Sequence, residues 1–300
     1  MKYKEIEIEE VNCECTDLRI CRGVLTAVTE GIALHEAKYL SGFGLITAAP
    51  IQTCIEGILS ESETPDGRRG VIIQFNVPSA VSYEKFHEAL LKRLFLIPHL
   101  PTCSLFDVSS KKEDSFIDIG ESIRKWGDGF EVSENYKGRD IYRIPIMTGD
   151  MLVEKTLNFY QGLDGALEIF AQNAVSCVVA AQEATCRIFN EVSGVANFNY
   201  PVGGVSGAKV GGINYTKERV TINDPFCPTL KNTIKNSKLP VGANAVIEYP
   251  IVGLDENSIK KALKIAIDTF ATTPGIIKIT SPSFGGQWGT HKIYLPKIIQ

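Results

Sequence analysis

Long apolar runs are missing from this sequence of 300 residues, and no stretch of it is apolar for long enough to span a bilayer. The first ten residues, MKYKEIEIEE, also lack the apolar segment of a secretory signal peptide. An excess of positive charge is missing too, since 31 lysines and arginines stand against 35 aspartates and glutamates. We therefore expect a cytoplasmic globular protein that binds no membrane and no nucleic acid.

Paired sets of metal ligands are also missing, although the sequence has eight cysteines. Cys13, Cys15 and Cys21 lie close together, but no C-x-x-C spacing occurs and no histidine lies near them. A structural metal site usually draws on two such clusters. We interpret the cysteines as reduced thiols that pack as small apolar side chains. A redox or metal protein built on this cluster is the rival interpretation, which metal analysis would decide.

The common phosphate-binding and catalytic motifs are absent as well. In the glycine-rich stretch PVGGVSGAKVGG (201–212), Ala208 separates Gly207 from Lys209, so the stretch does not match a P-loop. The sequence also lacks a dinucleotide fingerprint, a serine nucleophile elbow, a zinc-protease helix and a kinase signature. Glycine density alone leaves two interpretations open, a tight connection after a strand or a ligand loop. Lys209 favours a ligand loop slightly, because an exposed cation can meet an anionic group.

Periodicity of two kinds is present. Apolar residues three and four positions apart predict helices at 24–40, 84–97, 173–192 and 257–272. Strand-like runs follow these helices after short turns, at 43–49, 102–108, 195–200 and 276–281. Further strands are expected at 70–77 and 245–252, and turn residues with alternating apolar positions predict a β excursion at 124–147.

This order of elements predicts an α+β fold with two ferredoxin-like lobes of split βαβ type. We place an N-terminal lobe with a β insertion at 1–150, and a C-terminal lobe with the glycine-rich loop as its insertion at 151–300. A doubly wound parallel sheet fits less well, because 109–172 and 205–243 contain no clear helix.

A Pro-Asp-Gly turn in TPDGRRG (64–70) carries the first candidate binding groups. Arg68 and Arg69 offer planar guanidinium groups that could bind a carboxylate or phosphate. The pattern alone favours a hairpin turn with two solvated arginines.

Glu248 is a lone acid in the otherwise largely apolar run NAVIEYPIVG (244–253). On a strand with one exposed face, it would simply point to water. If the side chain is buried instead, desolvation would raise its pKa and keep it protonated near neutral pH. A carboxyl group of that kind can exchange a proton with a reacting centre.

Nine stretches, taken in order, carry a resemblance to a known family. They are SGFG (41–44), TPDGRRG (64–70), GDGF (127–130), GRDIYRIPIM (138–147), AAQEA (180–184), SGAKVGG (206–212), CPTLK (227–231), AVIE (245–248) and GLDENSIKKALK (253–264). Their order and spacing resemble the formylmethanofuran:tetrahydromethanopterin N-formyltransferases over nearly the whole chain. The resemblance implies two lobes of split βαβ type. It also implies formyl transfer between two one-carbon carriers, methanofuran and tetrahydromethanopterin, without a metal or other cofactor, in a homo-oligomer such as a dimer or tetramer.

The resemblance also implies roles for individual residues. The family's acid–base glutamate falls on Glu248, which would exchange a proton as a tetrahedral intermediate forms and collapses. The resemblance implies no covalent enzyme intermediate. The carriers end in carboxylates or a phosphate. We therefore assign substrate binding to Asp66, Arg68, Arg69, Gly203, Gly204, Ser206 and Lys209, and we assign no metal ligand.

Several stretches depart from the family pattern, among them the loop before SGAKVGG, which is about one residue shorter, the C-terminal SFGGQWGTHKIYLP and the N-terminal CECTDLRIC. PIQTCIEG (50–57) has Gln52 near the position where family members usually have a glutamate. The alternative function is therefore a silent or specificity-altered homologue, which binds a formylated pterin or docks in a formyl-handling complex.

Overall fold

The computed structural model describes residues 1–42, 50–111, 113–206, 223–282 and 289–300. The chain forms two compact units, in which Met1–Asp17 joins Gly162–Gln300 as the first unit and Leu18–Gln161 forms the second. None of the described helices is both long enough and apolar enough to cross a membrane.

The first unit is built mainly from one mixed sheet. Its strands lie in the order β1 (Lys2–Tyr3), β2 (Ile6–Ile8), β15 (Ile276–Thr280), β12 (Thr156–Ala171), β14 (Ala245–Gly253) and β13 (Val195–Asn197). Strand β12 begins in the second unit and enters this one at Gly162. A separate antiparallel pair joins β3 (Asn12–Cys15) to β16 (His291–Tyr294), which the short helix α6 (Leu295–Ile298) follows.

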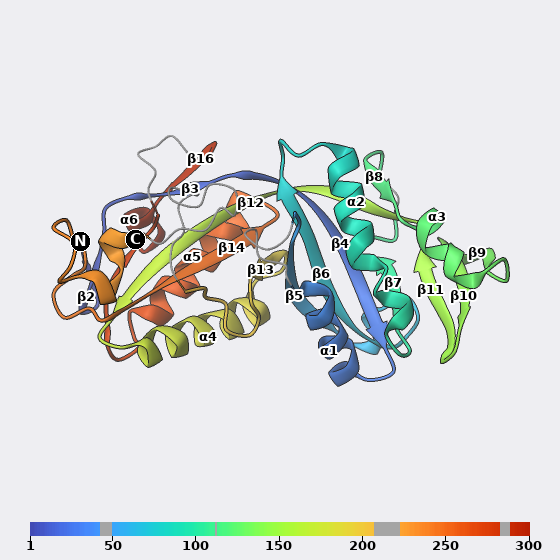
Figure 1. Cartoon of the computed structure of the whole chain (residues 1–300), viewed down its shortest axis with the longest axis horizontal. Coiled ribbons are helices and arrows are strands. Elements are labelled where there is room, and N and C mark those ends of the chain that lie inside the picture. Colours follow the sequence, from blue (N-terminus) through green and yellow to red (C-terminus); the bar gives the residue numbers. More distant parts are fainter. Residues whose placement is uncertain (43–49, 112, 207–222, 283–288) are drawn as a thin grey trace. The chain divides into compact units, whose positions relative to one another are not determined.

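Two helices, α4 (Ala174–Glu191) and α5 (Glu256–Phe270), lie side by side and pack on this sheet (Figure 1). Asn173 begins α4 because its side chain accepts a hydrogen bond from the Ser176 amide, and Asp255 does the same for Ser258 at the start of α5. The face of α4 turned toward the sheet is rich in alanine, which lets the helix approach the strands closely. The resulting core holds apolar residues of both helices together with those of β12, β14 and β15.

The second unit repeats this arrangement of strands and helices. The repeated elements are β4 (Asp17–Ala27), α1 (Glu30–Ser41), β5 (Gln52–Leu59), β6 (Arg69–Pro78), α2 (Tyr83–Leu94) and β7 (Ser104–Asp107). Strand β6 lies between β4 and β5, and β14 lies in the same way between β12 and β13. Strand β7 lies on the far side of β4, as β15 does of β12. The orders are β5-β6-β4-β7 here and β13-β14-β12-β15 in the first unit, with all neighbours antiparallel.

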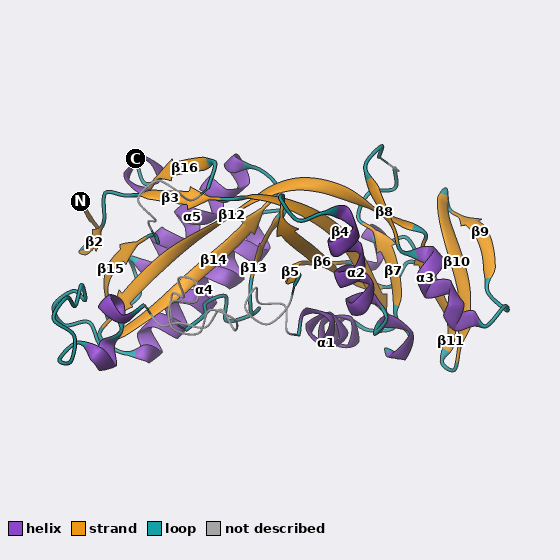
Figure 2. Ribbon diagram, turned by 45° about the horizontal axis from the view of Figure 1, so that its top comes forward, coloured by secondary structure: helices purple, strands orange, loops and turns teal. Residues whose placement is uncertain are grey.

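The sheet of the second unit is extended beyond β7 by a β meander (Figure 2). The added strands are β11 (Gly149–Glu154), β10 (Arg139–Ile146) and β9 (Val132–Tyr136). Strand β8 (Phe116–Asp118) pairs with the start of β12, and the short helix α3 (Gly120–Ile123) follows β8. The β excursion expected at 124–147 is therefore confirmed.

Three of the four expected helices are confirmed within a few residues, as α2, α4 and α5. The expected start of the helix at 24–40 is wrong, because Val24–Ala27 complete β4 and pair with β6. Helix α1 begins only after Thr29, whose side chain caps the Ile32 amide. The strands expected at 102–108, 195–200, 276–281, 70–77 and 245–252 are confirmed, although the one at 195–200 is shorter. The run at 43–49 lies outside the described residues.

The observed units differ from the expected lobes at 1–150 and 151–300. The first seventeen residues belong with the later half, because β2 pairs with β15 and β3 pairs with β16. Residues 151–161 belong with the earlier half, because the start of β12 pairs with β8. The sequence gives no local sign of these pairings, since they join segments far apart in the chain.

Candidate active site

Glu248 lies in the middle of β14, on the face of the sheet opposite the helices of the first unit. Ile247 and Tyr249 on either side of it are buried in the helix-facing core. Successive side chains of a strand point to opposite faces, so Glu248 points away from that core. Its side chain is nevertheless half-buried rather than fully solvated. The simple expectation that this residue points to water is therefore wrong.

Two neighbours flank Glu248 across the strands. On β12, Glu168 stands directly opposite Glu248 in the antiparallel register. On the other edge of β14, next to the segment that pairs with β13, Val205 forms an isolated β-bridge with Glu248 through two backbone hydrogen bonds, of 2.8 and 3.0 Å. One carboxyl group and one apolar side chain thus border the candidate catalytic residue.

Burial raises the pKa of both carboxyl groups. The pKa of Glu248 is raised to about 7, first by burial and then by the negative charge of Asp164. The pKa of Glu168, which is only 2% exposed, is also raised to about 7, by burial and by the charge of Glu248. Two carboxyl groups that hold protons near neutral pH therefore share one sheet face, which suits proton transfer.

Glu168 was not identified from the sequence, because β12 was not recognised as a strand. The run ALEIFA (166–171) does place Glu168 among apolar residues in the same way as AVIEYPI (245–251) places Glu248. A buried strand of this kind reads as a nearly continuous apolar run with an isolated acid, which is a weak signal on its own.

The beginning of the glycine-rich loop lies beside this site. Gly203 has a φ of +75°, and a Cβ there would collide with Thr185 and would lie 2.9 Å from the Tyr249 ring. A Cβ on Gly204 would collide with Ile247. Both glycines are therefore needed for close packing against α4 and β14. Ser206 follows Val205 and is exposed, whereas Lys209 lies outside the described residues.

The candidate residues of the turn at 64–70 lie in the second unit. Asp66 accepts hydrogen bonds from the Thr26 hydroxyl (2.7 Å) and from Arg68 Nε (2.8 Å). Arg68 also donates to the Thr26 hydroxyl and to the backbone oxygen of Thr102. Arg69 is more exposed and forms ion pairs with Glu30 and Glu61. Arg68 is thus held by internal contacts rather than solvated.

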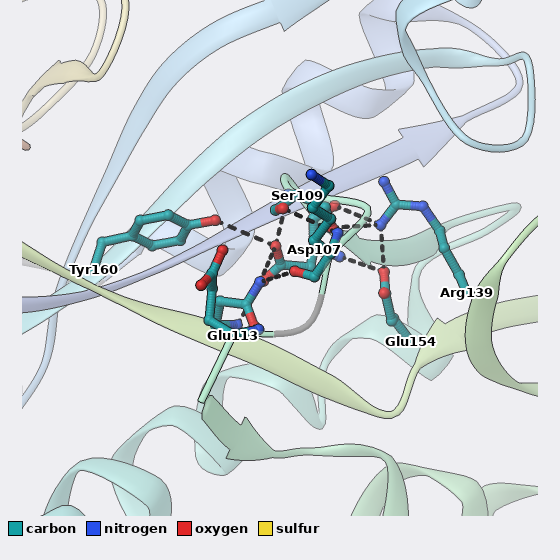
Figure 3. A network of polar contacts seen from close by, with 8 residues as sticks. Asp107, Ser109, Glu113, Arg139, Glu154 and Tyr160 are labelled. Atoms are coloured by element: carbon teal, nitrogen blue, oxygen red, sulfur yellow. Dashed lines mark hydrogen bonds and ion pairs between the residues drawn. The ribbon is translucent and has the colours of Figure 1, made fainter. Parts of the chain in front are cut away.

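The second unit contains a separate polar network around Asp107 at the end of β7 (Figure 3). The Asp107 carboxylate accepts hydrogen bonds from the backbone amides of Asn158 (2.6 Å) and Ser109 (2.7 Å). The carboxylate of Glu154 accepts from the Asp107 amide (2.8 Å) and from Arg139 (2.7 Å). Burial raises the pKa of Asp107 and raises that of Glu154 to about 7. Because these groups are paired with one another, we assign the network to joining β7, β10, β11 and β12.

Seven of the eight cysteines are buried, as expected for thiols that pack as small apolar side chains. Cys186 is the exposed one. The sulfur atoms of Cys13 and Cys15 lie 3.9 Å apart and face Gly165, whereas Cys21 lies on β4 of the second unit. Among the described residues, no three or more His, Cys, Asp or Glu side chains are grouped as metal ligands.

The chain has the mixed α+β fold of solved formyltransferases. It is 34% identical to the formylmethanofuran:tetrahydromethanopterin formyltransferase from Methanosarcina barkeri, with a TM-score of 0.90 over 99% of this chain and 100% of that one. A chain of the formyltransferase/hydrolase complex (FhcABCD) from Methylorubrum extorquens, solved with methylofuran, is 26% identical. Its TM-score is 0.88, and the match covers 100% of this chain and 99% of that one.

Sequence comparison identifies the family. The model described as "Formylmethanofuran-tetrahydromethanopterin formyltransferase" matches residues 1–146, and the model described as "FTR, proximal lobe" matches residues 149–298. The chain belongs to the formylmethanofuran–tetrahydromethanopterin formyltransferase family, as its motifs indicated. The enzyme from Methanosarcina barkeri is 35% identical over 302 residues, which cover 99% of this chain and 100% of the relative. The enzyme from Methanothermobacter thermautotrophicus is 35% identical over 300 residues, covering 98% and 99%.

The raised pKa values predict how stability depends on pH. Glu168 has a pKa of about 7 in the folded chain, against about 4.3 for an unfolded glutamate. The folded protein therefore binds the proton more tightly, and its stability falls as the pH rises from about 4 to about 7. We expect Glu168→Gln to increase the free energy of unfolding at about pH 8 by up to about 3 kcal/mol, and to change it little near pH 4.

Urea unfolding at both pH values measures this difference. Glu183→Gln is the matched control, because Glu183 is an exposed acid on α4 of the same unit. The control should change stability little at either pH. An equal effect of Glu168→Gln at both pH values would mean that the pKa of Glu168 is not raised in the folded protein.

Proposed function

We propose that this enzyme transfers a formyl group between formylmethanofuran and tetrahydromethanopterin. Family membership over nearly the whole chain supports the reaction and both carriers. The observation that carries the assignment to this site is Glu248, a half-buried carboxyl group whose pKa is raised to about 7. Retention of this residue favours an active enzyme over a silent homologue.

The reaction proceeds through a tetrahedral intermediate. The amine nitrogen of tetrahydromethanopterin attacks the formyl carbon, and the carbonyl π electrons move to the oxygen. The bond from the formyl carbon to the methanofuran nitrogen then breaks, its electron pair stays on that nitrogen, and the carbonyl re-forms. The attacking nitrogen loses one proton and the leaving nitrogen gains one, so the enzyme needs a group that exchanges a proton. No covalent enzyme intermediate is needed if both carriers are held in line.

Glu248 exchanges this proton or donates to the developing oxyanion. Backbone N–H groups of the glycine-rich loop, together with the Ser206 hydroxyl, supply further donors to the oxyanion. The two backbone hydrogen bonds between Val205 and Glu248 support this assignment, because they hold the beginning of that loop beside β14.

Cationic side chains bind the anionic tails of the carriers. Arg69 and Lys209 are the direct candidates, whereas Asp66 and Arg68 bond to each other and shape the turn that presents Arg69. Gly203 and Gly204 contribute by bringing the loop close to the sheet.

We further propose that each unit is a ferredoxin-like lobe, because both follow the order βαββαβ with the third strand between the first two. The enzyme assembles as a homo-oligomer in the cytoplasm and works without a metal or nucleotide cofactor, as the family resemblance implies. The absence of a phosphate motif from the sequence supports the lack of a nucleotide.

Formyl transfer by the purified protein tests the function. With formylmethanofuran and tetrahydromethanopterin, and without added metal or nucleotide, we expect formyl-tetrahydromethanopterin to accumulate. Treatment with a chelator should leave the rate unchanged. A rate lost on chelation and restored by one metal would contradict the cofactor assignment, and complete inactivity would favour the silent homologue.

Glu248→Gln tests the proton exchange. Glutamine keeps the shape and a hydrogen-bond donor but cannot exchange a proton, and general acid–base catalysis is typically worth about 100- to 10,000-fold. We expect kcat to fall by about that factor while KM for both carriers is largely kept. Near-normal turnover would move the catalytic assignment to another residue.

Arg69→Ala and Lys209→Ala test tail binding. Because these side chains hold parts of the carriers that do not react, we expect KM to rise and kcat to change little. Arg68→Ala serves as a comparison and should also lower stability, since Arg68 bonds to Asp66 and Thr26 within the fold. An unchanged KM in both test variants would exclude these two cations from tail binding.

A further inference from the structure

Glu168 is a buried carboxyl group to which neither the sequence motifs nor the proposed mechanism gives a role. We propose that Glu168 is a positioning residue for Glu248, with which it forms a carboxyl pair that holds one shared proton at neutral pH. This inference depends on the proposed role of Glu248 in proton exchange.

The register of the sheet brings the two groups together. Glu168 on β12 and Glu248 on β14 are direct partners in the antiparallel ladder. Directly opposed residues have Cβ atoms about 4.5–5.5 Å apart, and their side chains lie on the same face. Ile169 and Ile247, one position along each strand, are buried in the helix-facing core, which places both glutamates on the opposite face.

The part of the chain that the structure describes supplies no cation that pairs with either glutamate. The other cross-strand neighbour of Glu168 is the uncharged Thr280 on β15, and that of Glu248 is Val205. Among the described residues, neither glutamate carboxyl group has an ion-pair partner. Two ionised carboxylates in this position would repel each other, and a bound proton relieves the repulsion.

The other charged groups that face the pair do not remove this need. Lys278 on β15 is the nearest cation along the strand, but it already pairs with Glu7 and Glu9, at 3.1 and 2.9 Å. Glu9 and Asp164 add negative charge that acts on Glu168 and Glu248 respectively. In the segment after residue 222, the cation Lys238 lies over the Phe226 ring, which packs against Phe170 on the same face. Among the described residues, the charges that act on the pair are therefore mainly negative and favour retention of a proton.

The raised pKa values of the two glutamates agree with this geometry. Both pKa values are raised to about 7, and each is raised by burial and by negative charge. When two such groups interact strongly, the protons leave in two steps that belong to the pair rather than to either residue.

The pair also satisfies the proton balance of the reaction. The attacking nitrogen gives one proton to the pair and the leaving nitrogen takes one from it. Each turnover therefore ends with one proton on the pair, as it began.

The pH dependence of kcat/KM for Glu168→Gln tests the proposal. This variant keeps the side-chain size but removes the second charge, so the pKa of Glu248 should fall. We expect the alkaline limb of the profile to move to lower pH by about one unit or more, and the acid limb to weaken. Glu168→Asp keeps a carboxyl group and should restore most of the wild-type profile. Glu183→Gln on α4 should leave the profile unchanged.

The double variant Glu168→Gln/Glu248→Gln separates positioning from a structural role. If Glu168 acts through Glu248, the second substitution should add little to the loss already caused by Glu248→Gln. A uniform fall in kcat with an unshifted pH profile, or full additivity in the double variant, would overturn the proposal.

Carboxyl ¹³C NMR without substrate distinguishes failure of this proposal from failure of the proposed function. If the wild type transfers no formyl group, the function fails, but the Glu248 resonance still reports the pair. We expect its titration midpoint to move to lower pH in Glu168→Gln by about one unit or more. An unchanged midpoint would show that the two groups do not share a proton, whatever the enzyme's activity.

Discussion

The pairing register of β12 and β14 is the constraint on which the site depends. In this register, Leu167, Ile169 and Ile247 fill the core under α4 and α5, while Glu168 and Glu248 face the other way. A slip of one residue would send a strand's acid into that core and its apolar side chains out of it. The packing of the helices therefore fixes the position of the carboxyl pair, and no loop has to hold it.

Because this register places the carboxyl groups of Glu168 and Glu248 in buried and half-buried positions respectively, their ionisation costs free energy. Burying a carboxylate without a partner is strongly unfavourable, so these groups keep their protons instead. Thr185 and Tyr249 on the helix side contribute a hydrogen bond of 2.9 Å between their hydroxyl groups, which uses their polar atoms internally. On the face of β14 toward the helices, the polar group of Tyr249 is thus hydrogen-bonded within the protein. On the opposite face, Glu248 binds a proton.

The sequence was informative where local periodicity decides the structure. Apolar spacing identified α2, α4 and α5. The position of Glu248 as the lone acid in the strand at 245–252 identified it as a candidate site residue. The sequence was uninformative for β4 and β12, because long buried strands lack clear alternation, and Leu25 was therefore assigned to a helix. Glu168 was missed with its strand. The need for Gly203 and Gly204 arises from contacts with α4 and β14, which no local pattern encodes.

The first seventeen residues have a consequence for any shortened form of this chain. A fragment that begins at residue 151 would lack β2 and β3, so β15 and β16 would each lose a strand partner and expose unpaired backbone groups. Open edges of this kind template association between molecules. We therefore expect such a fragment to associate more readily than the full chain, even though a family model covers residues 149–298 alone. A circularly permuted chain that carries the N-terminal strands after residue 300 would keep those edges paired.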